Sequence, residues 1–175
     1  MKEEEAIALL IKAGCSSSVI EHCKTVAEYA RKIALDVENC ARKRRVPINI
    51  DMNCIIIGGL LHDIGRSKTH GIDHAVMGAR IAVEIGMNEK LVSIIERHIG
   101  AGITLDEALE LGLPAKDYLP LTLEEKIVAH ADNLAFGSRL GTIDEVVSNL
   151  QKKQLDIKII NRIIELNDEI NSMIC

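Results

Sequence analysis

Two polar residues, His62 and Asp63, stand side by side at the end of the apolar run GGLLHDIGR, residues 58–66. Adjacent residues on a helix point about 100° apart, so this pair is poorly placed to interact with itself. A buried carboxylate without a partner costs several kcal/mol or gives up its charge. Groups from elsewhere in the chain must therefore satisfy the pair.

Other histidines and aspartates also fall on apolar faces of expected helices. His22 shares a face with Val19 and Val26, and His98 continues the stripe of Leu91 and Ile94. The complete inward-facing set is His22, His62, Asp63, His74, His98 and Asp132. A hydrogen-bonded core side chain is the simpler interpretation of any one inward histidine. The two aspartates are harder to explain in that way, because no lysine or arginine lies on the same stripes.

Four histidines and two aspartates brought together would be a ligand set suited to divalent transition metals. Because His62 and Asp63 diverge, Asp63 can bridge two ions with its two oxygens while His62 binds one of them. Two other histidines are not expected among the ligands. His130 lies on a different face from Asp132 and is expected to be exposed or to support the site from outside, and His70 is expected in a solvated loop.

Helices must position these residues, since the apolar periodicity is helical almost throughout. The pattern predicts helices at about 2–13, 18–45, 51–63, 73–86, 89–99, 122–137, 143–150 and 155–174, with Ser18 and Thr122 as N-caps paired with Glu21 and Glu125. The segment 103–120 interrupts the pattern and resembles a lid or loop. We therefore expect a single all-α domain spanning 1–175, with a metal-site core at about 16–137 and C-terminal helices at 142–174.

The composition narrows the class of protein. Aromatic residues make up 2% of the chain, so the core must be aliphatic, and the formal net charge of −5 argues against nucleic acid as the main partner. The acidic start does not resemble a signal peptide, and no apolar stretch is long enough to span a membrane. The five cysteines show no CxxC spacing, and we expect reduced thiols in a cytoplasmic protein. A homo-oligomer remains compatible with the sequence.

The order His22, His62-Asp63, His74, His98, Asp132 resembles the HD-domain superfamily of metal-dependent phosphohydrolases, in its binuclear H…HD…H…H…D form. HDIGR resembles the HDIG variant of the signature, and the stretches DHAVMGARIA, ERHIGAGIT and TLEEKIVAHADNL are similar to bacterial diadenosine tetraphosphate hydrolases. The chain lacks the GYP motif expected of cyclic-di-GMP phosphodiesterases. Its insert after His98 is longer than the corresponding turn in the diadenosine tetraphosphate hydrolases.

The resemblance implies two divalent ions, of Fe, Mn, Ni or Zn. His22, His62, Asp63 and Asp132 would hold one ion; His74 and His98, with bridging Asp63, would hold the other. Such a pair activates water for attack on a phosphoryl group, so no protein nucleophile is needed.

Arg66 matches a basic residue that follows the signature in relatives. Its planar guanidinium suits phosphate oxygens. We expect Asp63 and Arg66 to act in catalysis, and Arg66, with Lys68 as the weaker second, to bind the substrate. Gly65 is expected to turn the chain so that Arg66 reaches the phosphate. The alternative for Arg66 is an exposed cation beyond a helix end.

The expected function is hydrolysis of a phosphoester or phosphoanhydride bond in a nucleotide or related small phosphorylated substrate. Two alternatives remain. One is a regulatory HD module that binds a metal or nucleotide without turnover, and the other is a helical bundle with hydrogen-bonded core histidines. The second alternative requires six independent coincidences on inward faces.

Overall fold

The computed structural model describes residues 1–175 and confirms the all-α fold, with one two-stranded hairpin as the exception. Its elements follow in this order: α1 Glu3–Ala13, α2 Ser17–Arg44, α3 Met52–Leu61, the 3-10 turn η1 Ile64–Ser67, α4 His74–Glu84, α5 Glu89–Arg97, α6 Leu105–Glu110, α7 Leu123–Leu134, β1 Ala135–Phe136, β2 Arg139–Leu140, α8 Ile143–Lys152 and α9 Ile157–Ser172. None of these helices is both long and apolar enough to cross a bilayer.

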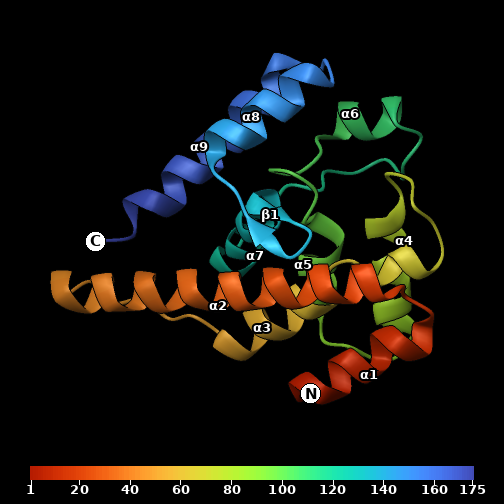
Figure 1. Ribbon diagram of the computed structural model, residues 1–175, viewed down its shortest axis with the longest axis horizontal. Helices are drawn as coiled ribbons and strands as arrows, with labels where there is room; N and C mark the ends of the chain where they lie inside the picture. Colours follow the sequence, from red (N-terminus) through yellow and green to blue (C-terminus); the bar gives the residue numbers. More distant parts are fainter.

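The central helix α3 is packed on all sides. It lacks a polar face, and α1, α2, α5 and α7 surround it. Two glycines permit this crowding: a Cβ on Gly59 would lie 2.8 Å from the Cα of Ala27, and one on Gly58 would lie 2.8 Å from Ile94. As Figure 1 shows, α2 runs the length of the molecule beside α3, while α8 and α9 lie on the far side of α7. The end of α3, which carries His62 and Asp63, is thereby held in the interior.

The main core is aliphatic, as expected. Its 31 buried residues are all Ala, Val, Leu, Ile or Cys, and the partly buried Tyr29 and Phe136 lie at its edge. A second, small cluster contains Tyr118 and residues of the α6 segment. The segment 103–120 is thus anchored by its own packing and contains one short helix.

Two expectations about helix starts need correction. Ser16, not Ser18, caps α2, because the Ser16 hydroxyl accepts a hydrogen bond from the Val19 amide while Ser18 bonds to Ser16. Three successive serines offer alternative caps that sequence alone cannot rank. Thr122 does cap α7, but the Glu125 carboxylate accepts from the Leu121 amide and pairs with Arg97. The reciprocal half of that capping box is therefore absent.

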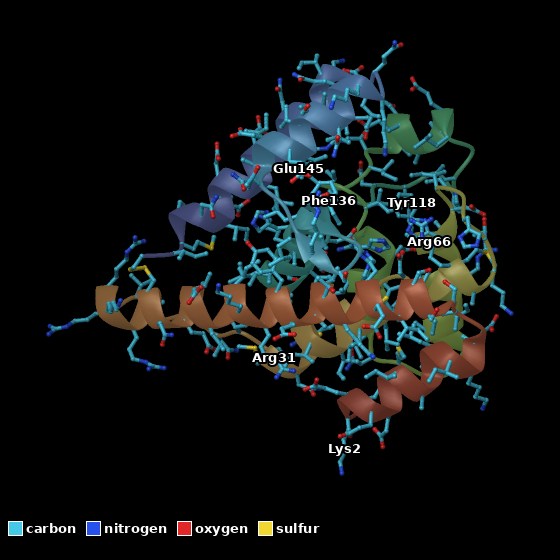
Figure 2. The ribbon with its side chains drawn as sticks, in the orientation of Figure 1. Lys2, Arg31, Arg66, Tyr118, Phe136 and Glu145 are labelled. Carbon is cyan, nitrogen blue, oxygen red and sulfur yellow. A yellow bond between two sulfur atoms is a disulfide. The ribbon has the colours of Figure 1, made fainter.

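The expectation that all five cysteines are free thiols is wrong for two of them. Cys40, near the end of α2, forms a disulfide with Cys175, 135 residues further along the chain. Figure 2 shows the bond where the C-terminal segment returns to α2. Cys15, Cys23 and Cys54 are free and buried.

Candidate metal centre

The six inward residues converge on one point between five helices. His22 comes from α2, His74 from the first residue of α4, and Asp132 from α7, while His98 directly follows α5. His62 and Asp63 form the junction between α3 and η1. His62, Asp63, His74 and His98 are almost completely buried, and His22 and Asp132 are partly exposed.

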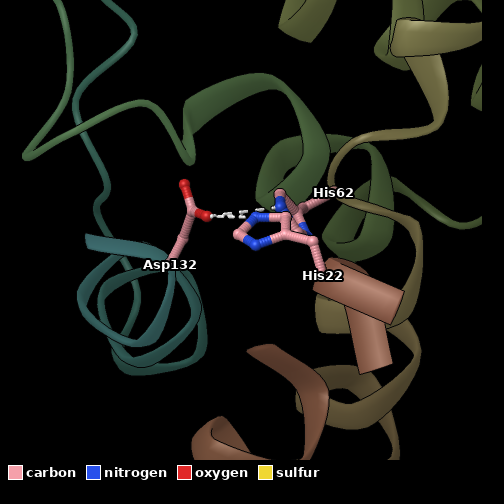
Figure 3. Close-up of side chains that lie close together, drawn as sticks. All are labelled: His22, His62 and Asp132. Atoms are coloured by element: carbon pink, nitrogen blue, oxygen red, sulfur yellow. Dashed lines mark hydrogen bonds and ion pairs between the residues drawn. The ribbon is translucent and has the colours of Figure 1, made fainter. Parts of the chain in front are cut away.

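The first half of the cluster contains His22, His62 and Asp132. Figure 3 shows both imidazoles directed at the Asp132 carboxylate. Asp132 Oδ1 lies 2.9 Å from His22 Nε2 and 3.4 Å from His62 Nε2. Three donor atoms of this kind within a few ångströms could hold a metal ion.

Asp63 connects this half to the second. Its Oδ2 faces His62 Nε2 at 3.8 Å, whereas its Oδ1 lies 3.1 Å from His74 Nε2 and 3.6 Å from His98 Nε2. The two carboxylate oxygens therefore face different sets of histidines. This is the arrangement that a bridging carboxylate requires.

Backbone carbonyls orient three of the four histidines. The Nδ1 atoms of His62, His74 and His98 lie 2.7 to 2.8 Å from the carbonyl oxygens of Gly59, Gly71 and Ile95. A carbonyl only accepts, so each Nδ1 carries a proton and donates. In each neutral ring, Nε2 then presents a lone pair to the interior, as metal-ligating histidines do.

Two features of the cluster favour the binding of a cation. His62 Nε2 is buried without a hydrogen-bond partner. The Nε2 atoms of His74 and His98 lie 3.1 Å apart, although both rings donate through Nδ1 to carbonyls. Two facing lone pairs repel unless a proton or metal ion lies between them. The donor set and its orphaned atom thus fit divalent metal ions.

The pKa values of His62 and Asp63 are shifted because the ionisable groups of the cluster lie close together. Burial alone would lower the pKa of His62, but the Asp63 and Asp132 carboxylates overcome it and raise that pKa to about 9. Burial would raise the pKa of Asp63, yet His62, His74 and His98 hold it far below its usual range. Both carboxylates thus favour a protonated His62, and a metal ion bound at its Nε2 would have to displace that proton.

Arg66 reaches the centre, whereas Lys68 does not. Arg66 Nε donates to Asp63 Oδ1 at 3.2 Å, and Nη1 donates to the His70 carbonyl at 3.0 Å. The apolar helix stripes supply no lysine or arginine for Asp63, and its cationic partner is instead Arg66, which lies on the turn that follows the helix. The Lys68 side chain is exposed and makes no hydrogen bond or ion pair, so the structure does not bring it into the site.

Gly65 has a different role from the one expected. A Cβ at this position would overlap the His74 carbonyl oxygen and lie 2.6 Å from the Gly78 amide. Gly65 therefore lets η1 pack directly against α4, which places Asp63 beside His74.

Of the two remaining histidines, one lies where it was expected, and for the other the exposed alternative is excluded. His70 is exposed, as expected. His130 is buried, and burial lowers its pKa to about 4. Helix α7 is covered by α2, α3, α5 and α9, so its face away from Asp132 is also interior.

Two cavities flank the cluster. A small polar one of about 310 Å³ is lined by His22, Asp63, Arg66, His70 and nearby serines. A larger one of about 810 Å³ has Asp132 in its wall. Sequence patterns predicted neither the two cavities nor the orienting carbonyls, although each carbonyl lies three residues before its histidine.

The HD domain family model matches residues 19–137, which include all six residues of the cluster. The chain belongs to the HD domain family. It is 54% identical over 175 residues to the uncharacterized protein MJ0778 of Methanocaldococcus jannaschii, with 99% of each chain covered.

Other relatives are larger proteins. The chain is 46% identical over 154 residues to the tRNA (cytidine(56)-2'-O)-methyltransferase of Thermoplasma volcanium, covering 88% of this chain but only 42% of that protein. It also resembles the HD domain of the phosphodiesterase PgpH of L. monocytogenes, with a TM-score of 0.51 over 96% of this chain and 98% of that one. At 18% identity, the similarity to the PgpH domain shows the fold alone.

Proposed function

We propose that the protein is a metal-dependent phosphohydrolase that uses two divalent ions, of Fe, Mn, Ni or Zn, to cleave a phosphoester or phosphoanhydride bond of a nucleotide. The observation that carries the proposal is Asp63, whose Oδ1 and Oδ2 face separate histidine sets. His22, His62 and Asp132 would hold one ion with Asp63, and His74 and His98 would hold the second. The bound ions would supply a water nucleophile and stabilise charge on the phosphoryl group.

Arg66 is proposed to bind the substrate phosphate. Its Nε and Nη1 are held by Asp63 and the His70 carbonyl, while Nη2 makes no hydrogen bond and the side chain lines the small polar cavity. A guanidinium fixed in this way can donate to a phosphate oxygen without losing further rotamer freedom. Nucleotide chemistry is supported by a structural neighbour, since the PgpH domain has been solved in complex with cyclic-di-AMP.

Metal content and phosphate release test the proposal together. Protein prepared with Mn or Fe should carry about two equivalents of metal and release phosphate from a nucleotide panel. Asp63→Ala should lose both ions and the activity, whereas His98→Ala should retain about one ion. His70→Ala is the matched control, because this exposed histidine lies outside the donor cluster. Wild-type protein that binds no metal and hydrolyses nothing with Mn or Fe would refute the proposal.

A second candidate is a nucleotide-binding module without turnover. The region matched by this chain makes up less than half of tRNA (cytidine(56)-2'-O)-methyltransferases from Thermoplasma volcanium and Picrophilus torridus. An HD domain attached to an RNA-modifying enzyme could serve binding alone. Thermal stabilisation by a nucleotide, with no phosphate released from metal-loaded protein, would favour this candidate.

A further inference from the structure

The larger cavity borders the candidate metal centre at Asp132. Its wall contains Asp132 itself, Ile99 next to His98, and Ile72 two residues before His74. Its volume of about 810 Å³ falls within the range of small-molecule sites, roughly 300 to 1,000 Å³. A substrate with its phosphate at the cluster can therefore extend into this space.

The lining is more apolar than phosphate binding requires. Half of its twenty residues are hydrophobic. The chain contains a single Phe, and that residue, Phe136, lies in the cavity wall. The β1–β2 hairpin carries Phe136, which is labelled in Figure 2. The Arg139 guanidinium lies over its ring, 4.8 Å from the centroid. The ring is partly buried against the core, and an aromatic ring in the wall of an apolar cavity suits a flat, aromatic group.

Polar groups stand at defined points of the same wall. The Asn149 side chain makes no hydrogen bond in the protein, so its amide is free to pair with the edge of a base. Lys152 and Lys153 are exposed, unpaired and also in the wall. Arg162, in contrast, is bound to Glu107 at 2.7 Å.

Much of this cavity lies outside the segment that defines the family. The family model ends at residue 137, whereas Val146, Asn149 and Ile159 belong to α8 and α9. The short helix α6 contributes Glu107 and Glu110 from the opposite side. The metal centre is therefore a family feature, but elements beyond the family segment complete the space beside it.

We propose that this cavity binds the base of the nucleotide substrate, and that Phe136 and Asn149 are specificity residues that stack on the base and hydrogen-bond to its edge. The inference rests on the proposed phosphohydrolase function and adds the part of the substrate that the metal centre does not recognise.

Hydrolysis kinetics give the first test. Mn-loaded protein is assayed with the four 5′-ribonucleoside monophosphates, with ribose 5-phosphate, which lacks a base, and with hexyl phosphate. We expect kcat/KM for at least one nucleotide to exceed that for ribose 5-phosphate at least tenfold. Leu111→Trp, which enlarges a side chain of the cavity wall directly after α6, should reduce this preference at least tenfold. Leu109→Trp is the matched control, because Leu109 is an exposed leucine of α6 outside the wall.

Phe136→Leu supplies a second variant that keeps the local packing apolar. Stacking on an aromatic side chain is worth roughly tenfold or more in affinity per base. We expect KM for the preferred nucleotide to rise roughly tenfold, with a much smaller effect on ribose 5-phosphate. Equal effects on both substrates would mean that Phe136 acts only through the fold.

Binding of free nucleosides separates this inference from the proposed function. Adenosine, guanosine, cytidine and uridine carry no phosphate, and saturation-transfer NMR on metal-free protein detects their binding without turnover. Binding that is lost in Leu111→Trp and kept in Leu109→Trp supports the base site even if nothing is hydrolysed. Hydrolysis without preference for a base, or a preference for hexyl phosphate that Leu111→Trp abolishes, overturns the base site while the phosphohydrolase function stands.

Discussion

Asp63 combines two roles in one side chain. It contacts His74 and His98 through Oδ1, and the same oxygen accepts from Arg66 Nε. The candidate metal ligand and the candidate phosphate-binding cation therefore touch each other. Because the guanidinium is held against Asp63, its free nitrogen lies beside the position where a phosphate would meet the ions.

Replacing Arg66 tests this arrangement. Arg66→Gln should reduce kcat/KM for a phosphoester roughly 10- to 100-fold, the amount expected for a lost charge-assisted hydrogen bond. Steady-state kinetics on metal-loaded protein measure the effect. Lys68→Gln is the control and should stay within about twofold of wild type, since Lys68 lies outside the cavity. Equal losses in the two variants would exclude a specific role for Arg66.

Sequence patterns predicted the positions of the six cluster residues because each interrupts an apolar stripe. The same patterns did not predict the ion pair between Arg66 and Asp63, since a turn brings Arg66 back after the helix has ended. For His130 the sequence left an exposed position open, because periodicity cannot show that α7 is covered on several faces. The sequence predicts which face of its helix a residue occupies. It does not predict which other elements pack against that face.

At the scale of elements, the junction between η1 and α4 is the most constrained contact near the site. Gly65→Ala should destabilise the protein by at least about 2 kcal/mol, because the added methyl group overlaps the backbone of His74. Urea denaturation measures the change. The same variant should lose metal, since η1 begins next to Asp63.

Gly86→Ala separates this packing effect from backbone strain. Gly86 has φ +74° and nothing within 4 Å of a Cβ, so alanine there should cost only about 1 kcal/mol. If Gly65→Ala costs no more than Gly86→Ala, the close contact between η1 and α4 is not a constraint on stability.

Helix α6 is attached to α9 by one ion pair with a predictable response to acid. Burial would raise the pKa of Glu107, but hydrogen bonds from the Thr104 amide and from Arg162 lower it below its ordinary value. The unfolded chain therefore binds a proton more readily than the native state, and stability falls as pH drops through and below about 4.3.

With Glu107→Gln, the free energy of unfolding measured by urea denaturation should vary less with pH between about 5 and 3. At pH 7, the free energy of unfolding of the variant should be lower than that of wild type. Urea titrations at several pH values measure both effects. An unchanged slope of stability against pH would show that Glu107 does not contribute to acid sensitivity.

Helix bounds were mostly predictable because Gly, Pro and capping residues mark them, as at Gly14 and Thr142. The hairpin at 135–140 was missed because strands of two residues carry no periodicity. It nonetheless holds the only Phe against the larger cavity. Short elements without a pattern thus determine part of the site.

For the whole molecule, the Cys40–Cys175 bond joins residues 135 positions apart and closes most of the 175-residue chain into a loop. No local spacing indicates such a pair, because only the packing of the α9 end near α2 brings the sulfurs together. Arg44 adds to this contact by donating to the Ser172 carbonyl. The disulfide fixes α9, which forms part of the larger cavity's wall.

Cys40→Ser should lower the free energy of unfolding by about 2 to 5 kcal/mol, because a cross-link across 135 residues restricts the unfolded chain. Urea denaturation with and without reductant measures this. Wild-type protein should match the variant only in reductant, and the variant should not respond to reductant. A wild-type stability independent of reductant would contradict the prediction.

The three carbonyls that orient His62, His74 and His98 belong to the main chain, and this affects how the centre tolerates mutation. No single amino-acid replacement removes a backbone carbonyl. Substitutions of the surrounding side chains therefore leave the three acceptors that orient these imidazoles in place. A designer could transplant the arrangement by copying three short backbone turns with their histidines, without rebuilding a shell of supporting residues.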